Sequence, residues 1–294
     1  QNALKKQLSI LKDIPVENIF IGNGSDEAID VLIRIFCTPS TDKILICPPT
    51  YGMYEVVASI QDIAILKAPL TNDFQLDIPV ITNIIQQEEQ LKMIFLCSPN
   101  NPTGNSLTGI ENILNTFKGV VVVDEAYIDF STETSYAAQL KKYPNLIVLQ
   151  TFSKAWGLAA ARIGMAYAST EIIKFMNKVK PPYNVSILNQ QAALTACEQQ
   201  QTTQKHLQTI IAQRLWLEQA LHNLACVVHV YPSDANFLLV AVKDADTLYK
   251  ALVAKKIIVR NRHSIVDNCL RITVGTVQEN QELIDALQRV PSNS

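Results

Sequence analysis

Residues 119–130 read GVVVVDEAYIDF. Four consecutive valines, 120–123, are followed by the two carboxylates of Asp124 and Glu125. A strand with one solvated face alternates apolar and polar side chains, whereas an unbroken apolar run indicates burial on both faces. This run therefore predicts a strand inside a sheet that helices cover on both sides. Its last residue, Asp124, needs a cationic or hydrogen-bonding partner, because burying an isolated carboxylate is costly.

Six further strand-like runs accompany this one, and amphipathic or turn-bounded helical stretches separate most of them. They cover residues 18–22, 43–48, 62–67, 91–97, 145–151 and 162–169. Seven strands that alternate with helices predict an α/β fold with an open, mostly parallel, doubly wound sheet. The last run follows its predecessor after a link too short for a helical crossover, so we expect it to be antiparallel.

The pattern changes after a long helical stretch at residues 186–223. Two strand-like runs, a helix, two more strand-like segments and a final helix follow, which predicts a smaller α+β domain. We expect a large domain over residues 14–205 and a small C-terminal domain over residues 206–294. We expect residues 1–13 to pack with the small domain.

The composition excludes several classes of function. Charged residues make up 18% of the 294 residues and the net charge is −2, which gives no electrostatic case for nucleic-acid binding. No apolar run approaches the ~20 residues that span a bilayer, and the N-terminus lacks a signal-peptide pattern. The six cysteines form no CxxC pair, and the four histidines have no ligand-like spacing. We therefore expect reduced thiols, a cytoplasmic location, no membrane partner and no metal.

The residues that follow the strands are the candidates for a site, because ligands of open α/β sheets bind beyond the carboxyl ends of the strands. GNGSDE (22–27) follows the first strand, but a glutamate replaces the third glycine of a dinucleotide-binding loop. The amides of Gly24, Ser25 and Asp26 would still open a helix and suit an anion. A plain tight turn is equally compatible with this loop.

Other strand ends also carry polar side chains. These are Tyr51, Asn101 in SPNNPTG (98–104), Asp124, Tyr127 and the pair Ser153-Lys154. An ordinary packed tyrosine, a proline-containing turn or a capping aspartate would explain several of them one at a time.

Residues 150–164, QTFSKAWGLAAARIG, place Lys154 among apolar and small residues, with Arg162 eight positions later. Burial lowers the pKa of a lysine and makes its amine nucleophilic. Pyridoxal phosphate (PLP) needs a lysine amine for its aldehyde and a carboxylate for its pyridine nitrogen, as well as a site for its phosphate. Lys154, Asp124 and the anion-binding groups match these needs together, although each is a modest signal alone.

Five motifs in chain order resemble those of the histidinol-phosphate aminotransferases, which are fold-type I PLP-dependent enzymes. The motifs are CPPTYGMY, SPNNPTG, VVVDEAYIDF, TFSKAWGLAAARIG and CLRITVGT. The resemblance covers essentially the whole chain. It implies a cytoplasmic homodimer that binds PLP and transfers the amino group of L-histidinol phosphate to 2-oxoglutarate, a step of histidine biosynthesis.

The resemblance also implies roles for the matching positions. Lys154, Asp124 and Tyr127 are similar to the family's catalytic residues: the Schiff-base lysine, the partner of the pyridine nitrogen and a donor to the phenolate oxygen. Further residues similar to those that bind the cofactor are Ser25, Asp26, Tyr51, Asn101, Ser153 and Arg162. The residues similar to those that bind the substrate are Arg260, Arg271 and Asn101.

Two departures from the family pattern stand out. Ala160 occupies a position where the family often has glycine. Family members also carry several dozen residues before the point where this chain begins, and these supply part of the substrate lid and a tyrosine that reaches the partner's cofactor. Without them we expect weaker cofactor retention and poorer substrate affinity.

Three alternatives to this function remain open from the sequence. The first is another fold-type I enzyme, such as an aromatic aminotransferase or a threonine-phosphate decarboxylase. The second is a nicotinamide-dependent oxidoreductase that uses GNGSDE as a Rossmann loop. The third is a non-catalytic relative that binds a ligand.

Overall fold

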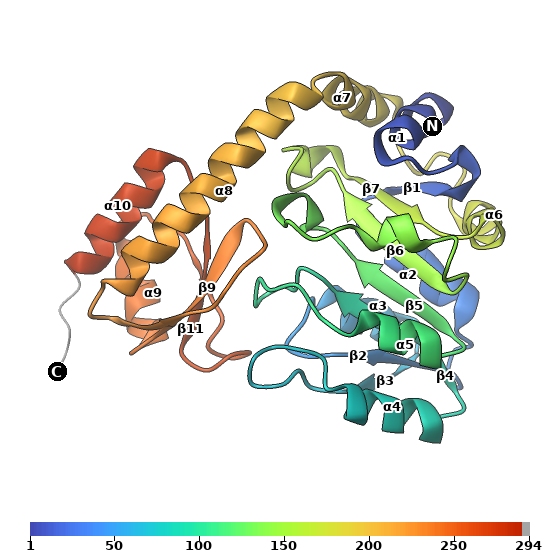
Figure 1. Cartoon of the computed structure of the whole chain (residues 1–294), viewed down its shortest axis with the longest axis horizontal. Helices are drawn as coiled ribbons and strands as arrows, with labels where there is room; N and C mark the ends of the chain where they lie inside the picture. Colours follow the sequence, from blue (N-terminus) through green and yellow to red (C-terminus); the bar gives the residue numbers. More distant parts are fainter. Residues whose placement is uncertain (290–294) are drawn as a thin grey trace.

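The computed structural model describes residues 1–289, which form two sheets joined by a long helix (Figure 1). The larger sheet has the strand order β1-β7-β6-β5-β4-β2-β3. Its strands are β1 (Ile19–Asn23), β2 (Lys43–Ile46), β3 (Ala64–Lys67), β4 (Leu91–Cys97), β5 (Val120–Asp124), β6 (Leu146–Thr151) and β7 (Ile163–Tyr167). Neighbours pair in parallel except β7, which is antiparallel to both β1 and β6. The predicted α/β class and the antiparallel seventh run are confirmed.

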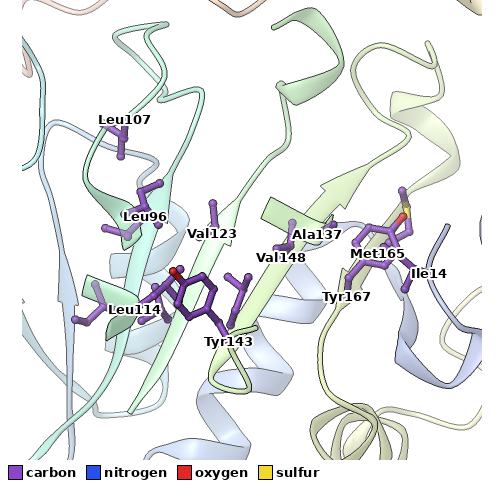
Figure 2. Close-up of a cluster of buried hydrophobic side chains, with 14 of the residues drawn as sticks. Ile14, Leu96, Leu107, Leu114, Val123, Ala137, Tyr143, Val148, Met165 and Tyr167 are labelled. Carbon is purple, nitrogen blue, oxygen red and sulfur yellow. The ribbon is translucent and has the colours of Figure 1, made fainter. Parts of the chain in front are cut away.

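Helices cover both faces of this sheet, as the valine run predicts. Val121 and Val123 belong to a buried cluster with α1, α4, α5 and α7, whereas Val120 and Val122 face a second cluster with α2, α3 and α6. Figure 2 shows part of the first cluster, in which Val123 and Val148 of the neighbouring strand lie side by side. The helices are α1 (Asn2–Lys12), α2 (Ser25–Phe36), α3 (Met53–Ile60), α4 (Ile78–Gln87), α5 (Ile110–Thr116), α6 (Thr170–Val179) and α7 (Ile187–Glu198). Short 3₁₀ helices are η1 (Val16–Asn18), η2 (Ile128–Phe130), η3 (Tyr136–Gln139) and η4 (Ala159–Ala161).

The smaller sheet is antiparallel, with the order β10-β11-β9-β8. Its strands are β8 (Val227–Val230), β9 (Phe237–Val242), β10 (Arg260–Asn261) and β11 (Cys269–Thr273), and its helices are α8 (Gln200–His222), α9 (Ala245–Ala254) and α10 (Val277–Gln288). These elements share a separate apolar core, as expected of an α+β unit. None of the helices in the described residues is both long and apolar enough to cross a membrane.

The helix predicted over residues 186–223 is two helices, α7 and α8, separated at Gln199. The polar stretch EQQQTTQ (198–204) has no apolar stripe that would hold one straight axis against the sheet. The predicted domain division between residues 205 and 206 falls inside α8 and remains a prediction. Residues 290–294 of the predicted small domain lie outside the described residues.

The N-terminal helix α1 packs on the large domain, so the prediction that residues 1–13 pack with the small domain is wrong. Leu4 and Leu8 are fully buried in the large-domain core together with Ile14, and α1 lies against α7 and β1. The two leucines are four residues apart and therefore form one stripe of the helix. The surface that α7 and β1 present to this stripe is apolar.

A small apolar cluster joins the two parts beside the carboxyl end of β5. Tyr127 and Phe130, from the segment after that strand, pack with Ala235 and Phe237 of the smaller part. Arg214 of α8 donates to the carbonyl oxygens of Ala235 (2.7 Å) and Phe130 (3.3 Å). These contacts fix the small sheet over the strand ends of the large one.

We predict that Leu8→Ala lowers the free energy of unfolding by about 2–5 kcal/mol, as expected for a buried leucine in a packed core. Ile10, on the same helix, is 78% exposed, so Ile10→Ala should change it by less than about 0.5 kcal/mol. Urea unfolding followed by circular dichroism measures both. Equal effects of the two substitutions would contradict the packing of α1 described above.

Candidate functional site

A cavity of about 300 Å³ opens where β4, β5 and β6 end and the small sheet faces them. The structure brings every site residue predicted from the sequence to its wall: Ser25, Asp26, Tyr51, Asn101, Asp124, Tyr127, Ser153, Lys154, Arg162, Arg260 and Arg271. Four other lining residues were missed, namely Cys97, Ala126, Thr151 and Arg262. Cys97 and Thr151 are the last residues of their strands, so the strand-end rule could have found them.

The carboxylate of Asp124 lines the cavity and is only 2% exposed. Its Oδ2 accepts a hydrogen bond from the Tyr54 hydroxyl at 2.8 Å, and its Oδ1 accepts one from the amide of Ala126 at 3.2 Å. Burial raises the pKa of Asp124 to about 6, and the Tyr54 bond opposes this rise. The sequence did not reveal Tyr54, whose ring is fully buried and stacks on Phe95 at 4.8 Å. Asp124 is therefore a buried acid with two donors and, among residues 1–289, no cationic partner in hydrogen-bond contact.

Lys154 follows β6 and projects into the same cavity. Its side chain is exposed to the cavity, which corrects the expectation that it is buried. The surrounding protein nevertheless lowers the pKa of Lys154 by desolvation, and the positive charge of Arg271 lowers it further. Its Nζ lies 5.1 Å from the centre of the Tyr127 ring. The amine is thus accessible and less basic than an ordinary lysine.

An anion-binding corner forms where α2 begins, beside β7. Gly24 has a φ of 79°, and a Cβ at this position would lie 2.5 Å from the guanidinium of Arg162. A Cβ on Gly164 would lie 2.1 Å from the amide nitrogen of Ser25. Only glycine at both positions lets the first amides of α2 and Arg162 approach one another. Helix N-termini attract anions, and a guanidinium next to one reinforces that preference.

Hydrogen bonds order the side chains around this corner. Arg162 donates to Asp26 at 3.2 Å and to the Ser153 hydroxyl at 3.4 Å. The Tyr51 hydroxyl also donates to Asp26, at 3.0 Å, and the Thr151 hydroxyl lies 3.0 Å from that of Ser153. Asp26 therefore holds Arg162 and Tyr51 in place, while its backbone belongs to the first turn of α2.

The opposite end of the cavity is formed by arginines of the small sheet. Arg271 donates to Oδ1 of Asn101 at 2.5 Å, and its guanidinium carbon lies 4.9 Å from the centre of the Phe237 ring. Burial lowers the pKa of Arg271. Arg260 faces Arg271 in the pairing of β10 with β11. The cavity thus has two cationic ends, with the lysine and the buried acid between them.

Residues 2–287 match the family described as aminotransferase class I and II. The chain belongs to this family. A histidinol-phosphate aminotransferase of Cytophaga hutchinsonii is 49% identical over 98% of this chain and 83% of its own length. This membership decides against a nicotinamide-dependent oxidoreductase.

Solved structures of related aminotransferases have the same fold. The histidinol-phosphate aminotransferase of Clostridium acetobutylicum superposes with a TM-score of 0.88, covering 97% of this chain and 87% of that one at 23% identity. The histidinol-phosphate aminotransferase of Sinorhizobium meliloti, solved in complex with pyridoxal-5'-phosphate, superposes with a TM-score of 0.86. The match covers 97% of this chain and 80% of that one at 22% identity. The fold-type I architecture predicted from the sequence is confirmed.

We predict that Asp124→Asn stabilises the cofactor-free protein at pH 8 by up to about 3 kcal/mol. The folded state keeps a proton on Asp124 up to a pKa of about 6, whereas the unfolded chain releases it near 3.8. Wild-type stability therefore falls as the pH rises through this window, and each pKa unit contributes about 1.4 kcal/mol.

Chemical denaturation of both cofactor-free proteins between pH 4.5 and 8 tests this. The difference in the free energy of unfolding between Asp124→Asn and wild type should shrink towards pH 4.5, where the wild-type carboxyl is largely protonated in the folded state. The neighbouring buried Glu125 is common to both proteins and cancels in the comparison. A difference that does not depend on pH would contradict the assignment to Asp124.

Proposed function

We propose that this chain is a PLP-dependent aminotransferase that transfers the amino group of L-histidinol phosphate to 2-oxoglutarate. The products are imidazole acetol phosphate and L-glutamate, and the step belongs to histidine biosynthesis. The observation that carries the proposal is a single cavity in which Lys154 and the buried acid Asp124 lie between two cationic ends. The 49% identity to a histidinol-phosphate aminotransferase supports this choice among the aminotransferases.

The residues of the cavity fit PLP. The two glycines leave room beside the first turn of α2 for a phosphate, which Ser25, Asp26, Ser153 and Arg162 would hold with backbone and side-chain donors. Asp124 has no cationic hydrogen-bond partner in the described part of the chain, and a protonated pyridine nitrogen would supply one. Tyr51 would cover the ring, and Asn101 and Tyr127 would bind its phenolate oxygen. Bound PLP supplies an electron sink for the electron pair left when a proton leaves the amino-bearing carbon of the substrate.

Lys154 is the group that binds PLP covalently and moves the proton. Its lowered pKa keeps a larger share of the amine neutral, and a neutral Nζ is both a nucleophile and a base. With PLP bound, this Nζ would take the proton from the amino-bearing carbon of the donor. The Tyr54 hydroxyl orients the carboxylate of Asp124, which would pair with the protonated pyridine nitrogen of PLP.

Arg271 binds the distal anion of either substrate. A guanidinium offers parallel donors that match both a carboxylate and a phosphate, so one residue can serve L-histidinol phosphate and 2-oxoglutarate in turn. Asn101 accepts a hydrogen bond from Arg271 at 2.5 Å and orients it. Arg260 adds positive charge at the mouth of the cavity.

The proposal includes a cytoplasmic homodimer. Two-fold symmetry is the commonest arrangement of soluble oligomers. Exposed apolar side chains gather in the segment before and at the start of α7, where Tyr183 is 96% and Leu188 is 78% exposed, with Ile187 between them. A protein partner would remove this apolar surface from water. Free cysteines, five of them buried, suit a reducing compartment.

We predict that the wild-type protein forms glutamate from L-histidinol phosphate and 2-oxoglutarate, and that Lys154→Ala and Lys154→Arg each reduce turnover by at least about 10³-fold. Arginine remains protonated and cannot replace the amine. Lys118→Ala, which changes an exposed lysine, is the matched control and should keep full activity.

Coupled glutamate assays measure turnover, and borohydride followed by mass spectrometry reports whether PLP is fixed to residue 154. Retained turnover in either Lys154 variant would overturn its role. Carbon dioxide release without a need for a keto acid would instead identify a decarboxylase of the same fold.

We predict that the protein sediments as a dimer and that Leu188→Asp shifts it towards the monomer. A charge on the exposed apolar segment would have to be desolvated in the interface, which costs more than burial of leucine. Val277→Asp, at an exposed position in the small domain, is the control and should leave the dimer intact. Sedimentation velocity over a range of concentrations decides, and a fully active wild-type monomer would refute the dimer.

A further inference from the structure

Three arginines of the small sheet line the cavity, although sequence reasoning identified only two of them. Arg260 and Arg271 face each other across β10 and β11. The amide of Arg262 donates to the carbonyl of Cys269 at 2.8 Å, so the pairing continues to Arg262, two residues beyond Arg260. Side chains two apart on a strand lie on the same face, which places Arg262 and Arg260 on one side. Within residues 1–289, none of the three forms an ion pair with an acidic side chain.

Arg262 and Arg260 differ in their surroundings. Arg260 is exposed, whereas Arg262 is half-buried and its Nε is inaccessible to water. The Nε atoms of Arg262 and Arg271 have no hydrogen-bond partner among the described residues, while both side chains line the same cavity. A buried donor without an acceptor costs free energy, and native proteins rarely leave one unsatisfied. An acceptor from outside the chain would satisfy both.

The charges around Arg271 also indicate that Arg262 is its closer arginine neighbour. The charge of Arg262 lowers the pKa of Arg271 more than the charge of Arg260 does. Burial raises the pKa of Tyr127, which also lines the cavity, and the charge of Arg262 opposes this rise. Arg262 is therefore the inner partner of Arg271, and Arg260 is the outer one.

The charge of the ligand decides which substrate needs two inner guanidinium groups. A carboxylate carries one negative charge and can be bound by one bidentate arginine, whereas a phosphate monoester carries about −1.5 to −2 and has three acceptor oxygens. The cofactor's phosphate belongs to the other end of the cavity, beside α2 and Arg162. We propose that Arg262, together with Arg271, binds the phosphate of the amino donor and is the residue that favours a phosphorylated donor over a dicarboxylic one. This inference rests on the proposed function, which it extends to a specificity-determining residue.

The test compares two half-reactions in the PLP-loaded enzyme. Arg262→Gln should lower kcat/KM for L-histidinol phosphate about 10- to 100-fold, the usual effect of losing a charged hydrogen-bond donor. The loss should appear mainly as a higher KM, because the phosphate is remote from the reacting carbon. For L-glutamate, kcat/KM should change less than about threefold. Arg262→Lys keeps the charge without the planar fork and should lie between wild type and Arg262→Gln.

Two controls exclude indirect effects. Arg34→Gln changes an exposed arginine of α2 that pairs with Asp30, and it should alter neither half-reaction. Cofactor absorbance should be equal in wild type and Arg262→Gln. Loss of the cofactor in Arg262→Gln would assign Arg262 to the cofactor's phosphate and overturn the proposal.

Inorganic phosphate separates this proposal from the proposed function. If wild type does not transaminate L-histidinol phosphate, the proposed function is wrong, but phosphate binding by Arg262 is still measurable as inhibition competitive with L-glutamate. Arg262→Gln should raise the inhibition constant of inorganic phosphate at least about 10-fold. An unchanged inhibition constant, or equal losses for both amino donors, would overturn the role of Arg262.

Discussion

The burial of β5 on both faces is the constraint from which the site follows. Four valines anchor this strand between two layers of helices, so the residue that ends it has almost no freedom to move. Asp124 therefore remains in a place where its charge is disfavoured, held by the Tyr54 hydroxyl and the amide of Ala126. The same layers fix the ends of β4 and β6, and hence the positions of Cys97 and Thr151 relative to that carboxylate. Chemistry at this edge of the sheet therefore depends on the packing of the core beneath it.

The small sheet completes the cavity through contacts made by the segment that follows Asp124. Tyr127 and Phe130 pack with Phe237 and Ala235, and Arg214 donates to carbonyls on both sides of this cluster. The turn at Ser233–Asp234 adds a second attachment: the amide of Asp234 donates to the carbonyl of Gly104, which closes the loop that carries Asn101. Each attachment involves a segment that carries a residue of the cavity wall, Tyr127 in the first and Asn101 in the second. A displacement of the small sheet would therefore move Asn101 and Tyr127 together with the arginines.

Much of this arrangement could be predicted from the sequence because it depends on local patterns. Apolar runs identify strands, and the carboxyl ends of neighbouring parallel strands meet at one edge, which is why Asp124, Ser153 and Lys154 could be placed together. Packing partners are not encoded locally: the stripe of Leu4 and Leu8 is evident, but the surface that it covers is not. Tyr54 was missed because its ring is part of the core and only its hydroxyl reaches Asp124. Arg262 was missed because motif resemblance directs attention to Arg260 and Arg271, whereas burial of individual nitrogen atoms is visible only in three dimensions.

The anion-binding corner depends on the absence of a Cβ atom at two glycines. Gly24 and Gly164 contribute no functional group, yet a methyl group on either would collide with Arg162 or with the start of α2. The two constraints differ: Gly24 has a φ of 79°, which L side chains rarely adopt, whereas a methyl group on Gly164 would collide with the backbone of Gly24 and Ser25. Each glycine is therefore as intolerant of mutation as a residue that performs chemistry, although its side chain is a single hydrogen atom. The groups around the corner can vary, whereas a larger residue at either position would have to displace Arg162 or the first turn of α2.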